Sequence, residues 1–252
     1  GANIAWYTND ALKEFERRFD ALAANGGTVA RVWLAPWSFL PEWKDTPLRN
    51  YANRELRMAW FDQILAMAEA RGLYLIVVLS EAGMFEPSAR WGDNPYNSAN
   101  GGPSATPRDF LTNEAARAAY RNQLRYIAAR WGYSPNILAW EWMNEVNSAP
   151  GFETDALLPW LLDMTKTLRA HDVNRHLITI SYAAVDGDPR VWALPEIDLV
   201  QRHEYNQADP LWFRALLNER NQPARFQQVR EQPVKPVIVA EFGANSDIER
   251  PQ

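Results

Sequence analysis

Two glutamates stand where short apolar, strand-like runs end, and their type and placement suit acid–base and nucleophilic chemistry. Glu145 ends the run that starts at Ile137, and Glu241 ends the run that starts at Pro236. A carboxyl group at the carboxyl end of a buried strand is partly desolvated, so it can hold a proton near neutral pH. Two such groups on equivalent strand ends of one sheet can face each other across a pocket. A facing pair of carboxyl groups is the arrangement that glycosidases use to break a glycosidic bond. The pair therefore predicts an enzyme.

Other polar residues in strand-like runs can support this pair. Arg31 is flanked by apolar residues, so its charge must be paired, either in a structural ion pair or beneath a catalytic carboxylate. His203 and Tyr205 are two positions apart and project to the same face of a strand, where they can hydrogen-bond a carboxylate and a sugar hydroxyl. A histidine of this kind is more often structural. Asn144 and Glu145 are adjacent, so we expect the strand to end or bulge at one of them.

The composition limits the classes of protein to which this chain can belong. With 252 residues, 47% hydrophobic and 23% charged, it is long enough for one large α/β domain and too apolar to be disordered. A net charge of −5 argues against a nucleic-acid surface, and the longest apolar run, residues 73–79, is too short to span a membrane. Three His and no Cys predict no zinc site, and no cofactor is expected. Twelve Trp offer faces for sugar rings, although most Trp side chains pack in a core.

Short strand-like runs alternate with longer helical patterns, which is typical of repeated βα units around a parallel sheet. Seven strands are expected, at residues 2–6, 29–35, 73–80, 137–144, 176–182, 198–205 and 237–242. Helical spacing of apolar residues is clearest at residues 10–24, 53–71 and 114–131. Because no linker or repeat divides the chain, we expect a single domain over residues 1–252. The pattern favours a (β/α) barrel over a doubly wound sheet, which would carry a Gly-rich loop after its first strand.

A long segment rich in Gly, Pro, Asn and Ser, residues 81–112, follows the third expected strand. In a (β/α) barrel the loops after the strands surround the active site, so this segment should emerge at the catalytic mouth. Loops of this length are more often functional than accidental. We therefore expect it to line one wall of a cleft, with Phe85, Trp91 or Tyr96 offering a face for a sugar ring. The alternative is that these aromatic side chains serve as a lid or in packing.

Four short motifs fall on the expected strand ends. They are Arg-Val-Trp-Leu from Arg31, Trp-Glu-Trp-Met-Asn-Glu ending at Glu145, His-Glu-Tyr from His203, and Ala-Glu-Phe-Gly around Glu241. Over residues 1–243 the chain resembles the retaining β-glycosidases of glycoside hydrolase clan A, most closely glycoside hydrolase family 5, the cellulase and mannanase group. The resemblance implies a (β/α)8 TIM-type barrel. It also implies that Glu145 is the general acid/base and Glu241 the nucleophile.

The same resemblance assigns roles to the residues around the pair. Asn144 would bind the sugar 2-hydroxyl, and His203 would line the subsite of the attacked sugar. Arg31 and Tyr205 would orient and ionise the nucleophile. The substrate-binding residues expected from the motifs and the long loop are Asn144, His203, Tyr205, Arg31, Trp33, Glu81 and Trp91.

Two features depart from the family pattern. Many members carry a His at the end of the third strand, where this chain has Ser80 and Glu81, so Glu81 or the long loop would make that sugar contact. Members also have an eighth strand that bears a Trp, but only nine residues, without an apolar run, follow Gly243. We therefore expect the eighth βα unit to be missing from residues 1–252, with unpaired edges on the first and seventh strands.

These expectations lead to an endo-acting, retaining hydrolase of β-glucan or β-mannan. An exo-acting β-glycosidase would use the same chemistry. A non-catalytic carbohydrate-binding barrel is the alternative from another class, although a pure binder has no use for both glutamates. We expect a monomer whose partner is its carbohydrate substrate, with neither nucleic acid nor membrane. A polysaccharide substrate would favour a secreted or periplasmic location.

Overall fold

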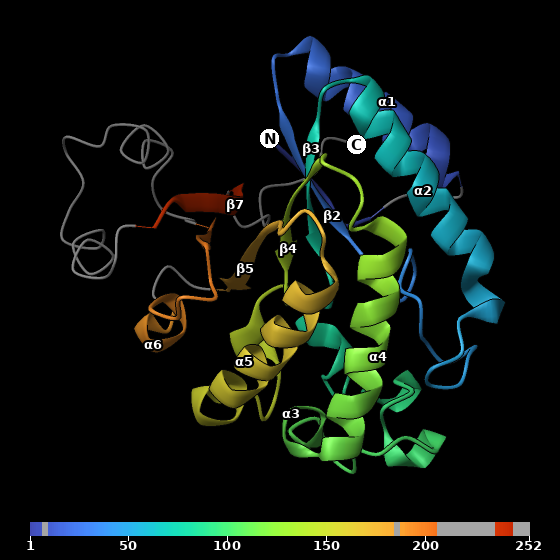
Figure 1. Cartoon of the computed structure of the whole chain (residues 1–252), viewed down its shortest axis with the longest axis vertical. Helices are drawn as coiled ribbons and strands as arrows, with labels where there is room; N and C mark the ends of the chain where they lie inside the picture. Colours follow the sequence, from blue (N-terminus) through green and yellow to red (C-terminus); the bar gives the residue numbers. More distant parts are fainter. Residues whose placement is uncertain (7–9, 184–186, 206–234, 244–252) are drawn as a thin grey trace, which may run out of the picture.

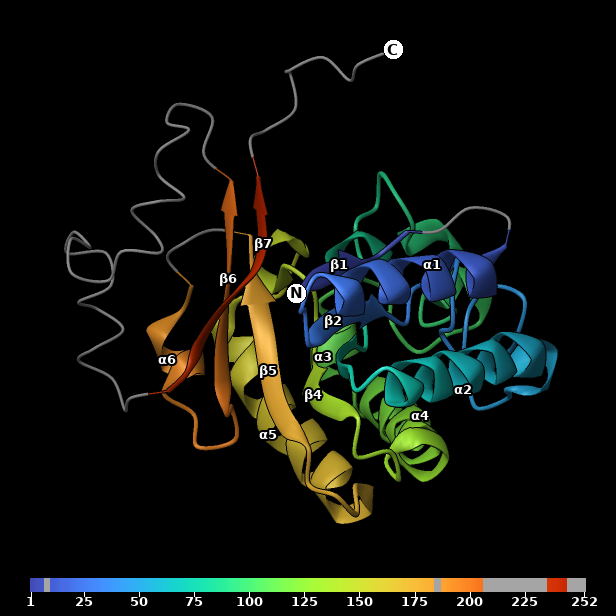
Figure 2. The same ribbon diagram turned by 90° about the horizontal axis from the view of Figure 1, so that it is seen from above.

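The computed structural model describes residues 1–6, 10–183, 187–205 and 235–243. Seven parallel strands form one sheet, ordered from β1 to β7 as they occur in the chain (Figures 1 and 2). Their bounds are β1 Ala2–Ile4, β2 Val29–Trp33, β3 Tyr74–Val78, β4 Ile137–Glu141, β5 Leu177–Tyr182, β6 Leu199–Tyr205 and β7 Val237–Gly243. The sheet curls into a nearly closed barrel, which confirms the expected fold class.

Helices pack on the outside of the sheet, as Figure 1 shows for α1, α2, α4 and α5. The helices are α1 Ala11–Ala24, α2 Glu55–Ala70, α3 Asp109–Thr112, α4 Glu114–Trp131, α5 Thr154–His171 and α6 Pro189–Trp192. The side chains of Asp10 and Asn113 accept backbone N–H groups at the starts of α1 and α4. After α1 and α2, Gly26 and Gly72 adopt φ angles of 71° and 64° and turn the chain towards the next strand. Within the part of the chain that the structure describes, none of these helices is long and apolar enough to cross a membrane.

Alternate residues of the strands face two different layers. Val32 belongs to the large apolar cluster between strands and helices. Ile76, Ala139 and Leu199 form a smaller cluster in the barrel interior. Arg31 is in register with Ile76, so its side chain also points inward. The polar residues found on inward positions near the carboxyl ends of the strands therefore converge on one site.

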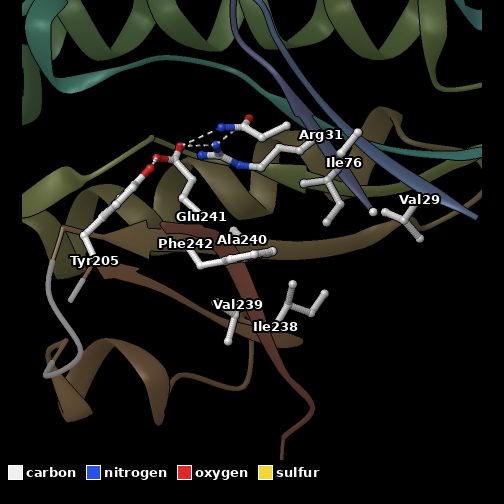
Figure 3. A pocket seen from close by; sticks show the side chains of 12 residues that line it. Val29, Arg31, Ile76, Tyr205, Ile238, Val239, Ala240, Glu241 and Phe242 are labelled. Atoms are coloured by element: carbon white, nitrogen blue, oxygen red, sulfur yellow. Dashed lines mark hydrogen bonds and ion pairs between the residues drawn. The ribbon is translucent and has the colours of Figure 1, made fainter. Parts of the chain in front are cut away.

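The barrel has a seam between its first and last strands. Among the described residues, β1 pairs only with β2, and β7 pairs only with β6. A cavity of about 490 Å³ lies at this seam, with Ala2, Val29, Ile76 and Ile238 in its wall (Figure 3). The unpaired edges match the expectation from the sequence. Residues 244–252 lie outside the described part of the chain, so the missing eighth βα unit stays a prediction.

The long segment after β3 folds into short turns rather than an open loop. It contains the 3-10 turns Ala82–Met84, Trp91–Asp93 and Ser98–Asn100, and it ends in α3. Asn94 Nδ2 donates to the carbonyl oxygen of Met84 at 3.0 Å, and Asn97 Nδ2 donates to that of Trp91 at 3.0 Å. The Asn residues that made the segment look loop-like therefore satisfy its backbone from within.

The aromatic side chains of this segment are buried. Phe85, Trp91 and Tyr96 are 1%, 7% and 4% exposed and belong to the large apolar cluster. The Phe85 ring lies 4.8 Å from that of Phe110 and 4.7 Å from that of Phe152. The prediction that these residues stack on sugar rings is therefore wrong, and the expected substrate contact of Trp91 falls with it. Burying these rings removes their apolar surface from water, and this stabilises the folded form of the long segment.

Candidate active site

The expected residues meet at the carboxyl end of the barrel, and a bulge in β7 helps to bring them there. His203 on β6 is in register with Glu241 on β7, after a shift that leaves Ala240 as an extra residue. Ile238 packs against the interior cluster, so regular alternation would point Glu241 away from the interior. The bulge reverses this parity and aims Glu241 inward, level with His203.

Glu241 accepts hydrogen bonds from three side chains. Arg31 Nη1 donates to its Oε1 at 2.7 Å, and Asn3 Nδ2 donates to the same oxygen at 3.0 Å. The hydroxyl of Tyr205 donates to Oε2 at 2.8 Å, and Figure 3 shows Tyr205 and Arg31 converging on this carboxylate. Burial and the Glu241 charge raise the pKa of Tyr205, so the phenol remains a donor. Donors on both oxygens fix the orientation of this carboxylate, as a nucleophile requires.

Arg31 serves two carboxylates at once. Its Nε and Nη2 donate to Glu141 at 2.7 and 2.6 Å, while Nη1 donates to Glu241. Burial alone would raise the pKa of Glu141, but the Arg31 charge outweighs burial and lowers this pKa below its usual value. Nη2 also donates to Asn144 Oδ1 at 2.7 Å. The two alternatives raised by the sequence are therefore both realised, a buried ion pair and a cation beneath the second glutamate.

Glu145 sits beyond the end of β4 in an unusual backbone conformation. The strand ends at Glu141, and Glu145 has φ 54° and ψ 51°, the left-handed region that non-glycine residues seldom adopt. Its backbone N–H donates to Ser181 Oγ at 3.0 Å, and Ser181 Oγ donates in turn to Glu141 Oε1 at 2.8 Å. This confirms that Asn144 and Glu145 do not continue a regular strand. The break lets both side chains reach the interior.

His203 lies between the two glutamates. Its Nδ1 is 2.8 Å from Glu145 Oε1 and 3.5 Å from Glu241 Oε2. Because carboxylate oxygens only accept, Nδ1 is assigned the hydrogen. One carboxylate oxygen of each glutamate and a ring nitrogen of His203 all lie within 4.8 Å of one another. Within the described ranges, this trio is also the one group of acidic and His side chains close enough to hold a metal ion.

Glu81 borders the site from the end of β3. Its carboxylate accepts the backbone N–H of Gly83 at 2.7 Å and pairs with Arg90 Nη1 at 3.4 Å. Burial raises the pKa of Glu81 and the neighbouring Glu145 charge adds to the rise, against the opposing effects of Arg90 and the Gly83 N–H. Trp33 is 8% exposed, and its Nε1 donates to Asn3 Oδ1 at 3.2 Å.

An aromatic platform that the sequence did not reveal stands at the end of β1. The rings of Trp6 and Trp37 are parallel, with centroids 3.9 Å apart, and the guanidinium of Arg90 lies 4.5 Å from the Trp37 centroid. Trp6 is 56% exposed. Position alone could have suggested Trp6, since it follows a strand that ends at the catalytic mouth. An exposed indole face of this kind suits the apolar face of a sugar ring.

The site can do acid–base and nucleophilic chemistry with two carboxylates. The site brings together six residues as expected and three that were not foreseen. The expected ones are Arg31, Asn144, Glu145, His203, Tyr205 and Glu241, and the others are Asn3, Glu141 and Ser181.

A parallel (β/α) barrel with facing glutamates after β4 and on β7 is the arrangement of the clan that the motifs resemble. Comparison with known families agrees. The chain belongs to the cellulase family, glycosyl hydrolase family 5, whose model matches residues 1–251.

Relatives with mannanase names are among the proteins that this chain is similar to. Mannan endo-1,4-beta-mannosidase A from Aspergillus aculeatus is 34% identical over 119 residues, which cover 47% of this chain and 29% of the relative. Mannan endo-1,4-beta-mannosidase F from Aspergillus clavatus is 25% identical over 285 residues, which cover 98% of this chain and 61% of the relative. The chain thus spans less than two thirds of either relative. The structure of the endo-1,4-beta-mannanase from Rhizomucor miehei matches with a TM-score of 0.73 and 18% identity, over 98% of this chain and 78% of that one, a likeness of fold.

Proposed function

We propose that this chain is a retaining glycoside hydrolase that cleaves β-linked polysaccharide, with β-mannan as the favoured substrate and β-glucan as the second. The observation that carries the proposal is the approach of Glu145 and Glu241, whose carboxylate oxygens lie within 4.8 Å with His203 between them. Retaining enzymes hold their carboxyl groups about 5–5.5 Å apart, whereas inverting enzymes leave about 6.5–9.5 Å for a water. The short separation supports direct attack.

The reaction would proceed by double displacement. Glu241 attacks the anomeric carbon while Glu145 gives its proton to the glycosidic oxygen, so that bond breaks and a glycosyl ester of Glu241 forms. Glu145 then takes a proton from water, which attacks the anomeric carbon and frees Glu241. Arg31 and Tyr205 orient the nucleophile through their hydrogen bonds. Asn144, held by its bond with Arg31, is assigned to the sugar 2-hydroxyl.

Mannan is favoured because the two relatives described above are named as mannan endo-mannosidases. Mannose and glucose differ in the orientation of the 2-hydroxyl, the group assigned to Asn144. The outer face of Trp6, which stacks on Trp37, offers a contact for a further sugar ring. A contact for a sugar ring in addition to the one that is attacked suits a polymeric substrate, and this supports endo over exo cleavage.

A polysaccharide panel with product analysis tests the proposal. Reducing sugar should be released from β-1,4-mannan or glucomannan before β-1,4-glucan, with a rapid fall in viscosity. Proton NMR should show the β-anomer first. An α-anomer released first would overturn retention, and monosaccharide alone would indicate exo action. Lack of hydrolysis with retained binding would favour the non-catalytic barrel.

The partner of this protein is then the carbohydrate itself, bound by a monomer that uses no nucleic acid, membrane, metal or cofactor. The Nδ1–H of His203 already lies between Glu145 and Glu241 and makes a contact that a cation would have to displace, so hydrolysis should persist in EDTA. A loss that divalent cations restore would contradict the metal-free mechanism. Sedimentation of the active protein tests the monomer.

A further inference from the structure

A residue on the first strand reaches the nucleophile across the seam of the barrel. Asn3 lies on β1 in register with Arg31 on β2. Its Nδ2 donates to Glu241 Oε1 at 3.0 Å. Its Oδ1 accepts from Arg31 Nη1 at 3.1 Å and from Trp33 Nε1 at 3.2 Å. The Asn3 amide therefore joins strands β1, β2 and β7 at the mouth of the barrel.

The orientation of this amide follows from its partners. Arg31 and Trp33 have only N–H groups to offer, so the atom of Asn3 that faces them must be the accepting oxygen. The NH2 group then necessarily faces Glu241, whose ionised carboxylate can only accept. An inverted amide would set donor against donor on one side and acceptor against acceptor on the other. Asn3 is thus a defined donor to the nucleophile.

The two oxygens of Glu241 are held unequally. Oε1 receives both Arg31 and Asn3. Oε2 receives the Tyr205 hydroxyl and is the oxygen that lies 3.5 Å from His203 Nδ1, on the side of the acid/base glutamate. Oε1 is therefore the anchored oxygen and Oε2 the one turned towards the reaction.

We propose that Asn3 is a positioning residue that fixes Oε1 of Glu241 and so presents Oε2 for attack. The proposal rests on the proposed glycosidase function. It adds a requirement that the four strand-end motifs do not contain. The contact of Asn3 with Glu241 matters because of the seam. Within the described residues no backbone hydrogen bonds join β1 to β7, and the nucleophile is connected to β1 through side chains.

Asn3→Asp tests this role with almost no change of shape. The new side chain can still accept from Arg31 and Trp33 but sets a carboxylate against Glu241, where two like charges resist joint ionisation. With an aryl β-mannoside, kcat/KM at pH 7 should fall by about 100-fold or more, and the acid limb of the pH profile should move up by about one unit or more. Asn3→Ala, which adds no charge, should lower kcat about tenfold or more at nearly constant KM. The matched control is Asn25→Asp, the same change after α1, which should keep the parent profile.

A stability cycle separates this proposal from the glycosidase function. Asn3→Asp should lower the melting temperature more at pH 8 than at pH 4.5, and adding Glu241→Gln should remove this difference, whether or not the protein hydrolyses any substrate. If the parent is inactive and the cycle behaves in this way, the proposed function fails while the Asn3 contact stands. If Asn3→Asp and Asn3→Ala both keep the activity and pH profile of the parent, Asn3 only closes the seam and the proposal is overturned. If Asn3→Asp does not fold, Asn3→Ala decides by its kcat.

Discussion

Glu145 and Glu241 are the same residue in two different surroundings, and this difference assigns their roles. The Glu241 side chain is 11% exposed and accepts from Arg31, Asn3 and Tyr205. The Glu145 side chain is 28% exposed and contacts His203 Nδ1. Several donors hold a carboxylate in one orientation, which suits the group that attacks. Solvent access and fewer donors suit a group that must give up and regain a proton.

Replacing each glutamate by alanine should therefore cause different failures. With Glu241→Ala no glycosyl ester can form, so every substrate should lose hydrolysis by several orders of magnitude. With Glu145→Ala, a dinitrophenyl β-mannoside needs no proton for its leaving group, so one equivalent of phenol should appear in a burst and turnover should then stall. Stopped-flow absorbance measures the burst, and mass spectrometry should find the trapped glycosyl-enzyme. Azide should restore turnover to Glu145→Ala by attacking the glycosyl-enzyme, with the β-mannosyl azide as the product. Equal loss of the burst in both variants would show that the roles are wrongly assigned.

The sequence predicted the site residues that carry a motif and missed those whose position depends on the register of the strands. The glutamates, Arg31, His203 and Tyr205 stand on recognisable strand ends. Asn3 reaches Glu241 only because a bulge at Ala240 turns Glu241 inward, and a bulge cannot be read from alternation. The ion pair of Arg31 with Glu141 likewise depends on how β2, β3 and β4 align.

A buried carboxyl group joins the loops that follow β2 and β3. Glu42 is 1% exposed, accepts the backbone N–H of Arg49 at 2.6 Å, and receives the Tyr96 hydroxyl at 3.4 Å. Burial raises the pKa of Glu42 to about 7, against the opposing effect of these hydrogen bonds. Arg49 has a φ of 67°, which a non-glycine residue keeps only when its surroundings fix it. The protonated form of Glu42 therefore suits the folded state.

This raised pKa ties stability to pH. The folded pKa of Glu42, about 7, lies above the ordinary 4.5, so its contribution is fully present below about pH 4.5 and is lost as the pH rises through about 7. Glu42→Gln keeps a neutral group of the same shape. It should match the parent at pH 4.5 and exceed it at pH 8 by up to about 3 kcal/mol in the free energy of unfolding. Urea denaturation at both pH values measures this, and a difference that does not change with pH would contradict it.

Two aromatic side chains near the mouth, one buried and one exposed, should separate packing from binding. Phe85→Ala removes a 1% exposed ring between Phe110 and Phe152, so it should cost roughly 3–5 kcal/mol of unfolding free energy.

Trp6→Ala removes a 56% exposed ring and should cost no more than about 1 kcal/mol of unfolding free energy. It should raise KM for polymeric mannan several-fold and leave a small aryl glycoside unaffected. An unchanged KM for the polymer would rule out Trp6 as a sugar platform.

Helices and strands could be predicted where the periodicity of apolar residues is strong. The predictions were wrong or incomplete where the amino-acid composition was misleading. Gly, Pro, Asn and Ser in residues 81–112 suggested an open wall, yet these residues make tight turns that let Phe85 and Tyr96 pack inward. Helix α5 was not foreseen, because Pro159 inside it interrupts the helical pattern. Tertiary packing decides both cases, and a single sequence does not show it.

The whole molecule was predictable because few topologies satisfy a strict alternation of strands and helices. Both faces of a parallel sheet must be buried, and a barrel does this by placing the helices on its outer face and side chains in its interior, so seven such units in one domain leave a barrel as the simplest solution. All seven strands fall within three residues of their expected bounds at either end. The side-chain bridges across the seam were not foreseen, since they depend on how the first and last strands approach each other.

The seam should divide the barrel into strands of unequal stability. In a parallel sheet an inner strand donates its amides alternately to both neighbours, whereas β1 and β7 have one neighbour each among the described residues. Their outward amides lack a ladder partner, so hydrogen exchange should be fast there and slow in β3 and β4. Asn3 and Arg31 hold Glu241 at the mouth of the seam, so the slowest exchange within β7 should lie near Glu241 rather than at Val237. Peptide-resolved deuterium uptake measures this gradient, and protection of β1 and β7 equal to that of β3 would show that another segment covers the seam.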